Sequence, residues 1–152
     1  MSESDAQPVR CMFLPFEEKG LLVPSTGVAE IVGLSPPTEV EDAPEWLAGK
    51  MNWRGLDIPL LSMERVLGDD VPPPGVRNRV AVMHAMDGAL QPGFYGIVIQ
   101  RLPTVVLASE RNVAASDSAA SDWRQGVLDL EVGRALIPNF DYLEGELGRL
   151  AA

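Results

Sequence analysis

Few side chains in this sequence of 152 residues could do covalent or metal chemistry. His84 is the single histidine and Cys11 is the single cysteine, so a zinc site built from Cys and His ligands has too few donors. A nucleophilic cysteine needs a neighbouring base, and nothing in the local sequence brings His84 to Cys11. We therefore interpret His84 as a strand residue and Cys11 as a small buried apolar residue.

Carboxylate pairs and motifs also give little support for catalysis. The pairs Glu17-Glu18 and Asp69-Asp70 lie in polar turns, where solvated side chains are expected rather than a glycosidase pair. The chain contains no GxSxG elbow, no phosphate-binding loop and no GxGxxG motif. These observations favour a binding module over an enzyme, and we expect no catalytic residue, no metal and no cofactor.

Residues 44–62 form a less generic segment. Asn52, Trp53, Arg54 and Gly55 follow one another just before a strand with a proline at its centre. Gly55 permits a positive φ, and Asn52 can bond the nearby backbone. An arginine held at a turn suits a carboxylate on a partner surface, and Trp53 adds contact area. A solvated turn charge beside a core tryptophan would give the same pattern, so local sequence alone leaves the function open.

Short strands must position this segment. Apolar runs bounded by turn signals predict strands at 11–17, 20–23, 27–34, 56–62, 79–86, 94–100, 102–108, 127–132 and 134–138. Pro59 predicts that its strand lies at a sheet edge or a bulge. Helical turns are expected at 44–48 and 63–67, and leucines at helical spacing predict a C-terminal helix over 140–150. The pattern indicates an all-β barrel or a pair of small barrels.

The expected organisation is one domain with two halves. We expect a flexible N-terminus over 1–10 and a single domain over 11–150. The run 69–75 contains three consecutive prolines, which favour extended backbone that cannot donate hydrogen bonds. It is the predicted boundary between sub-barrels 11–76 and 77–139.

The charge of the chain limits its partners. The net charge is −10, with 12 basic and 22 acidic residues, so nucleic acid and acidic membranes would be repelled. A single cysteine allows no internal disulfide, and the first eight residues carry no secretory pattern. The apolar runs are too short to span a bilayer. We expect a cytoplasmic protein without membrane insertion.

The 44–62 segment resembles a pattern of the CheW family of chemosensory adaptors. In that pattern a P-x-x-x-x-G turn precedes Asn-Leu-Arg-Gly, two variable residues and Ile/Val-Pro followed by two apolar residues. Upstream, Val28-Ala29-Glu30-Ile31 is similar to the V-x-E-I segment of the family. Strands at 79–82, 94–99 and 135–138 extend the resemblance over roughly residues 11–148.

This resemblance implies a mainly β fold of two SH3-like five-stranded barrels that share a hydrophobic core. It implies no chemistry and no cofactor. The partners would be the cytoplasmic tips of methyl-accepting chemoreceptors and the regulatory domain of a CheA-type histidine kinase. Asn52, Arg54 and Gly55 would lie at or support a receptor-facing groove, and Val28 and Glu30 would lie on the same barrel.

Three positions depart from the family pattern. Trp53 replaces the usual Leu, Gln100 stands where the family usually has Asp, and 137–141 matches the closing strand loosely. The chain is in this respect similar to the ChpC and PilI proteins of pilus chemosensory systems, which control twitching motility. Alternatives are a CheW-like adaptor of a non-motility kinase, a free-standing kinase regulatory domain, or a small β-barrel hydrolase. The hydrolase would need a convergent polar pocket.

Overall fold

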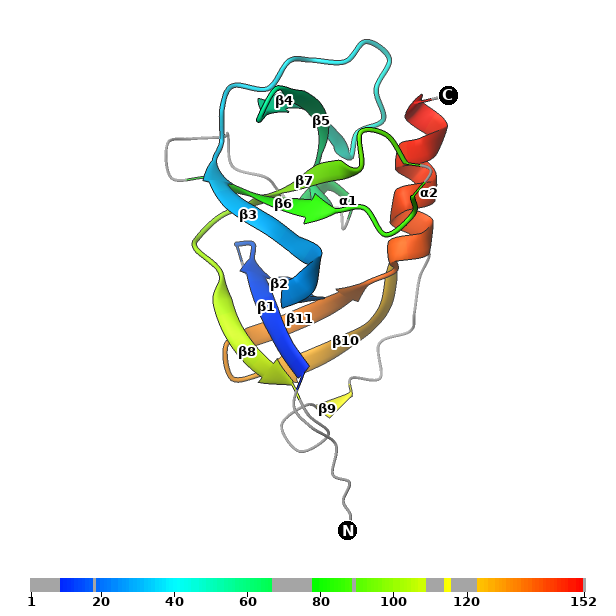
Figure 1. Cartoon of the computed structure of the whole chain (residues 1–152). Helices are drawn as coiled ribbons and strands as arrows, with labels where there is room; N and C mark the ends of the chain where they lie inside the picture. The colour runs from blue at the N-terminus through cyan, green and yellow to red at the C-terminus, as the bar shows by residue number, and fades with distance from the viewer. Residues whose placement is uncertain are drawn as a thin grey trace.

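The structure is a computed structural model in which residues 9–17, 19–66, 78–88, 90–108, 114–115 and 123–151 are described. Figure 1 shows two groups of strands, one above the other, with a helix standing along one side of the upper group. Within the described residues, no helix is long and apolar enough to cross a membrane.

The lower group is a six-stranded sheet, called sheet A here, with strand order β8-β1-β2-β11-β10-β9 (Figure 1). Its strands are β1 (Val9–Pro15), β2 (Lys19–Pro24), β8 (Thr104–Ala108), β9 (Ala114–Ala115), β10 (Arg124–Leu130) and β11 (Gly133–Pro138). The β2–β11 pair is parallel and the other pairs are antiparallel. Sheet A therefore joins the two ends of the chain.

The upper group is a five-stranded sheet, called sheet B, with order β3-β6-β7-β5-β4 (Figure 1). Its strands are β3 (Val28–Gly33), β4 (Leu47–Trp53), β5 (Leu56–Leu61), β6 (Arg79–His84) and β7 (Phe94–Ile99). The helical elements are η1 (Ser25–Gly27), α1 (Met63–Val66) and α2 (Phe140–Ala151). The predicted C-terminal helix is thus confirmed.

The two sheets do not follow the predicted ranges 11–76 and 77–139. Sheet B takes all its strands from the middle of the chain, and sheet A takes the strands on either side. The proline-rich run 69–75 suggested a boundary between the two halves because it interrupts local structure. Which strands belong to which sheet is instead decided by pairing between distant parts of the chain. That run lies outside the described residues. Val9 and Arg10, assigned to a flexible end, are already part of β1.

Two local predictions were also wrong. Residues 44–48 form a turn followed by the start of β4 at Leu47, not a helical turn, because pairing with β5 extends this segment. Pro59 lies in β5, which is an inner strand between β7 and β4. It pairs with Lys50 of β4, and the ladder to β7 begins only at Leu60, so the proline is accommodated without an edge position.

The buried apolar side chains form three clusters. One lies within sheet A and includes Phe13 and Leu22, and a second lies within sheet B and includes Ile58 and Val80. The largest cluster combines residues of both sheets with leucines of α2: Leu14, Phe16, Leu21, Ile97, Ile99, Leu143 and Leu147 are examples. Burial of this apolar surface is the main stabilising term. It fixes the two sheets into one body, as the prediction of a shared core requires.

Helix α2 is also bound to sheet B by a buried carboxylate. Glu144 is 3% exposed, and its two oxygens accept hydrogen bonds from the backbone N–H groups of Met86 (2.8 Å) and Asp87 (2.7 Å). The Tyr95 hydroxyl donates to the same carboxylate at 3.5 Å. Burial, together with this negative charge, raises the pKa of Tyr95 well above its usual value. The helix thereby orders the loop that follows β6.

Candidate partner-binding site

Arg54 and Gly55 form the two-residue loop between β4 and β5. Trp53 pairs with Leu56 across this hairpin, and both loop residues have positive φ, 50° at Arg54 and 81° at Gly55. Two positive φ values characterise the type I′ turn, whose twist matches that of the flanking strands. The positive φ expected at Gly55 is confirmed. Arg54 adopts the same strained region, which is unusual for a residue with a long side chain.

The Arg54 side chain is held by two neighbours. Oε1 of Glu30, on β3, accepts hydrogen bonds from Trp53 Nε1 at 3.0 Å and from Arg54 Nη2 at 3.2 Å. The guanidinium carbon lies 5.1 Å from the centre of the Trp53 ring, within cation–π range. The Arg54 side chain is 69% exposed. An ion pair this exposed contributes at most about 1 kcal/mol to stability, so its main effect is to orient the guanidinium.

The same contacts close one end of sheet B. β3 and β4 are its two outer strands, yet Glu30 of β3 reaches Trp53 of β4. The sheet must therefore curl until its edges meet, as the right-handed twist of strands allows. Trp53 also packs on Phe94 with ring centres 4.9 Å apart, and Phe94 packs on His84 at 5.3 Å. Side chains from four strands thus converge at the mouth of this barrel.

The structure separates the predicted site residues into three groups. Glu30, Trp53, Arg54 and Gly55 lie together as described above. Asn52 is exposed in β4 opposite Asp57, beside the turn rather than within it. Val28 is half-buried and packs against the core shared by the sheets.

Cys11 and His84 occupy different sheets. Cys11 is 7% exposed within β1 of sheet A, and burial raises the pKa of its thiol. His84 ends β6 in sheet B as an exposed residue packed on Phe94. A buried thiol with a raised pKa is a poor nucleophile, and no base lies in position to activate it among the residues described. Both residues have the structural positions expected from the sequence.

The sequence did not reveal an apolar surface on sheet A. Leu102, Val105 and Leu107 are 66%, 48% and 55% exposed, on and just before the outer strand β8. Val105 and Leu107 share a face because side chains alternate along a strand, and Val106 between them packs inward. Exposed apolar side chains grouped in this way mark contact surfaces. The sequence predicted the strand, but alternation alone does not show which face stays uncovered.

Comparison with known proteins assigns the chain to a family. A model of the CheW-like domain matches residues 10–143. The chain belongs to the CheW-like domain family. A chemotaxis protein CheW from Rhizobium meliloti (strain 1021) is 27% identical over 108 residues, covering 68% of this chain and 66% of that relative, just under two thirds of its length. This supports the resemblance seen in residues 28–31 and 44–62.

A solved structure confirms the fold of this CheW-like domain. The crystal structure of the scaffolding protein TtCheW from Thermoanaerobacter tengcongensis matches with a TM-score of 0.71, covering 87% of this chain and 89% of that one. The sequence identity is 16%, so this likeness concerns the fold alone. The prediction of two SH3-like β units with a C-terminal helix is confirmed, with the two-residue β9 added as a sixth strand of sheet A.

Gln100, which departs from the family pattern, has a structural explanation in this CheW-like domain. Its Nε2 donates to Oε1 of Glu64 at 2.7 Å, and its Oε1 accepts from Asn78 Nδ2 at 3.1 Å. Glu64 is 2% exposed. An aspartate at residue 100 would place a second carboxylate beside this buried one, at a large electrostatic cost. The amide instead links α1 to the residue that precedes β6.

We expect that Arg54 is not needed for stability of the CheW-like domain. Asparagine tolerates the left-handed region, and Asn-Gly is a preferred type I′ pair, so Arg54→Asn should leave the unfolding free energy within about 1 kcal/mol of the wild type. Urea denaturation measures this. Glu30→Ala is the comparison, since it leaves the half-buried Trp53 N–H without its acceptor and should cost about 1 kcal/mol or more. A loss above about 2 kcal/mol for Arg54→Asn would contradict the prediction.

Proposed function

We propose that this chain is a non-catalytic cytoplasmic scaffold that couples methyl-accepting chemoreceptors to a CheA-type histidine kinase. Membership of the CheW-like family supports this, as do a relative described as a chemotaxis protein and a structural neighbour described as a scaffolding protein. The observation that carries the proposal is the geometry of Arg54. A long cationic side chain occupies a strained turn, is oriented by two neighbours and points to solvent.

Such an arginine is prepared for binding a carboxylate. One of the five guanidinium N–H donors is engaged by Glu30, which leaves donors for a bidentate contact with a partner. Because Trp53 and Glu30 already restrict the side chain, less conformational entropy is lost on association. Strain that adds nothing to stability is often found at functional positions. We assign Asn52, Arg54 and Gly55 to partner binding, with the receptor tip as the expected occupant.

A scaffold needs a second surface that keeps a fixed position relative to the first. The exposed apolar residues of β8 lie on sheet A, whereas Arg54 lies on sheet B. Both sheets contribute to one core, so the two surfaces belong to a single rigid body. A partner held at one surface is thereby placed in a defined orientation to a partner at the other. Each contact can be modest because many copies in an array add avidity.

We further propose that the system served is a pilus chemosensory system that controls twitching motility. The support is the departure from the common family pattern at Trp53 and Gln100. Deletion of the gene in its own host should then reduce twitching and leave swimming unchanged. Loss of swimming with normal twitching would assign the chain to the other type of system.

The Arg54 site is tested by a charge reversal. Arg54→Glu should weaken binding at least tenfold, about 1.4 kcal/mol, because it replaces the donor with a charge that repels the partner carboxylate. Binding is measured by titration calorimetry against a chemoreceptor tip fragment and, separately, against the kinase regulatory domain. The partner whose affinity falls is the one that occupies this site.

A matched control is available in sheet A. Arg134 is also exposed and forms an ion pair with Asp129 at 3.2 Å, so Arg134→Glu makes the same change of charge elsewhere. We expect Arg134→Glu to bind the receptor tip fragment and the kinase regulatory domain with the affinities of the wild type. Unchanged binding of both partners to Arg54→Glu would remove Arg54 from the site. Equal losses in both variants would mean that overall charge, and not the turn, governs association.

A further inference from the structure

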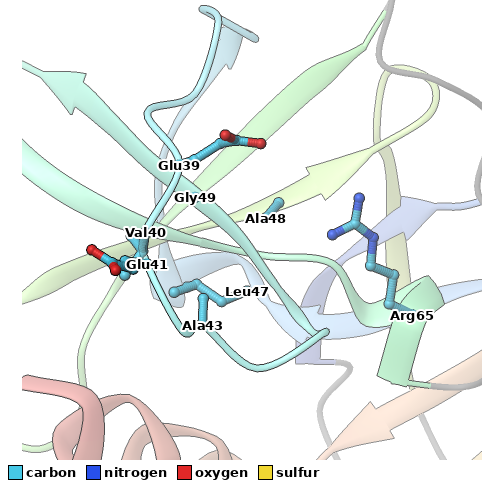
Figure 2. A pocket seen from close by; sticks show the side chains of 8 residues that line it. All are labelled: Glu39, Val40, Glu41, Ala43, Leu47, Ala48, Gly49 and Arg65. Carbon is cyan, nitrogen blue, oxygen red and sulfur yellow. The ribbon is translucent and has the colours of Figure 1, made fainter.

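The segment 39–47 stands beside the β4–β5 hairpin and borders three hollows. Two of them, about 200 and 370 Å³, share the lining residues Asp42, Ala43 and Leu150 and so adjoin each other between this segment and α2; together they are called the groove here. The third, about 520 Å³, lies along the same segment toward Arg65 of α1. Figure 2 shows the third hollow, with the carboxylates of Glu39 and Glu41 leaving the segment in different directions and the Arg65 side chain extending from α1 across from them.

The smaller hollow of the groove has an apolar floor. This floor is built from Val40, Leu47, Pro59, Leu90, Pro92 and Leu147. These side chains come from the segment, the β4–β5 hairpin, the loop before β7 and α2, so four parts of the fold meet there. Leu150 at the rim is 43% exposed. An apolar floor of this kind gains free energy when another apolar side chain covers it.

The rim of the groove is predominantly acidic. Glu41, Asp42 and Asp57 are exposed along the groove and Glu39 along the adjacent third hollow, and none of these four residues forms an ion pair with another described residue. Of the cations nearby, Arg149 pairs with Glu146 at 2.8 Å, whereas Arg65 lines only the third hollow, where it donates to the carbonyl oxygen of Glu45 at 3.3 Å and keeps its charge. Lys50 is the remaining cation in the lining. The groove therefore carries an excess of negative charge.

We propose that this groove binds a basic amphipathic segment of a partner protein. Apolar side chains of the segment would cover the floor, and its lysine or arginine side chains would meet the carboxylates of the rim. Charge complementarity selects this occupant, because an acidic segment, an anionic lipid or a nucleic acid would be repelled by the same rim. An amphipathic helix in a groove is an established mode of peptide recognition.

This surface is distinct from the Arg54 site. None of Val28, Glu30, Asn52, Trp53, Arg54 and Gly55 lines the three hollows. The Arg54 turn offers a cation to a partner carboxylate, whereas the groove offers carboxylates to partner cations. Binding at the groove can therefore be tested separately from binding at the Arg54 site.

The probe is a fluorescein-labelled synthetic peptide of leucine and lysine with helical periodicity, titrated with the full chain and followed by fluorescence anisotropy. The same peptide with glutamate for every lysine is the reference. We expect saturable binding of the lysine peptide only. Glu41→Lys/Asp42→Lys should weaken that binding at least tenfold. Both residues are exposed, and circular dichroism checks that the variant is folded.

Two control variants match the groove variants. Glu17→Lys/Glu131→Lys makes the same change of charge at exposed turns of sheet A and should bind the peptide like the wild type. Leu150→Ser tests the apolar rim against Val132→Ser, because both side chains are 43% exposed. Only Leu150→Ser should lower the affinity. The proposal is overturned if the two charge variants lose the same affinity for the lysine peptide. It is also overturned if the two serine variants change that affinity equally, or if the glutamate peptide binds.

Discussion

Replacing Gly96 with valine should destabilise the domain by about 3 kcal/mol or more, because an inner strand of sheet B has no room for a side chain there. A Cβ added at Gly96 would lie 2.6 Å from Leu60 Cδ2 and 2.6 Å from Val80 Cγ1. Both neighbours are fully buried, and valine cannot move its methyl group away as a long flexible side chain could. Urea denaturation followed by tryptophan fluorescence measures the loss.

Gly33→Val is the matched control for this prediction. Gly33 ends β3 in the same sheet, and a Cβ there would meet nothing within 4 Å. Valine favours strand geometry, so the unfolding free energy should change by no more than about 0.5 kcal/mol. If the two variants lost similar stability, β propensity or the unfolded state would explain the effect, and the close packing at Gly96 would not.

Glu144→Ala should cost about 3 kcal/mol, since the buried carboxylate accepts two backbone N–H groups and the Tyr95 hydroxyl. Without it, α2 loses its polar link to the loop after β6, and the Tyr95 hydroxyl loses a partner inside the core. Denaturation by urea measures the stability, and hydrogen exchange at Met86 and Asp87 measures the local effect. Exchange at these two amides should accelerate more than exchange in sheet A.

Glu146→Ala provides the comparison on the same helix. Glu146 makes an i,i+3 ion pair with Arg149, whose side chain is 80% exposed, and such pairs contribute about 0.5 kcal/mol or less. The substitution is the same as at Glu144, so helix propensity changes equally. Should Glu144→Ala prove no more harmful than Glu146→Ala, the buried hydrogen bonds would contribute no net stability.

Local sequence predicted most strands of this fold but not their partners. Alternating apolar residues and turn signals located β1, β2, β6, β7 and β11. The parallel pairs β2–β11 and β5–β7 join segments that are far apart along the chain, and no local pattern records such pairing. The division into two halves was wrong for this reason. A proline-rich run reports a local interruption and says nothing about which strands share a sheet.

The segment 44–48 shows where tertiary structure overrides a local preference. A proline followed by Glu, Trp, Leu and Ala favours a helical turn in isolation. In the fold, the residues after Trp46 pair with β5, and Lys50 also exchanges backbone hydrogen bonds with Thr38. Pairing on both sides makes an extended backbone more favourable than a single helical turn.

The candidate site could be predicted in part. The turn residues Arg54 and Gly55 followed from local sequence, and the resemblance placed Glu30 on the same barrel. The hydrogen bonds from Trp53 and Arg54 to Glu30 required the structure, because they connect the two outer strands of a curled sheet. The groove beside α2 had no signal in the sequence, since four separate parts of the chain build it.

The pairing of β2 with β11 has a consequence for the order of folding during synthesis. Lys19, Gly20 and Leu21 align with Arg134, Ala135 and Leu136, which are synthesised much later than the first hairpin. The first hairpin must wait several seconds with an unpaired edge, at the usual rate of about 5–20 residues per second. The middle of the chain holds all the strands of sheet B and can close earlier. Contacts this distant also predict slow refolding for a protein of this size.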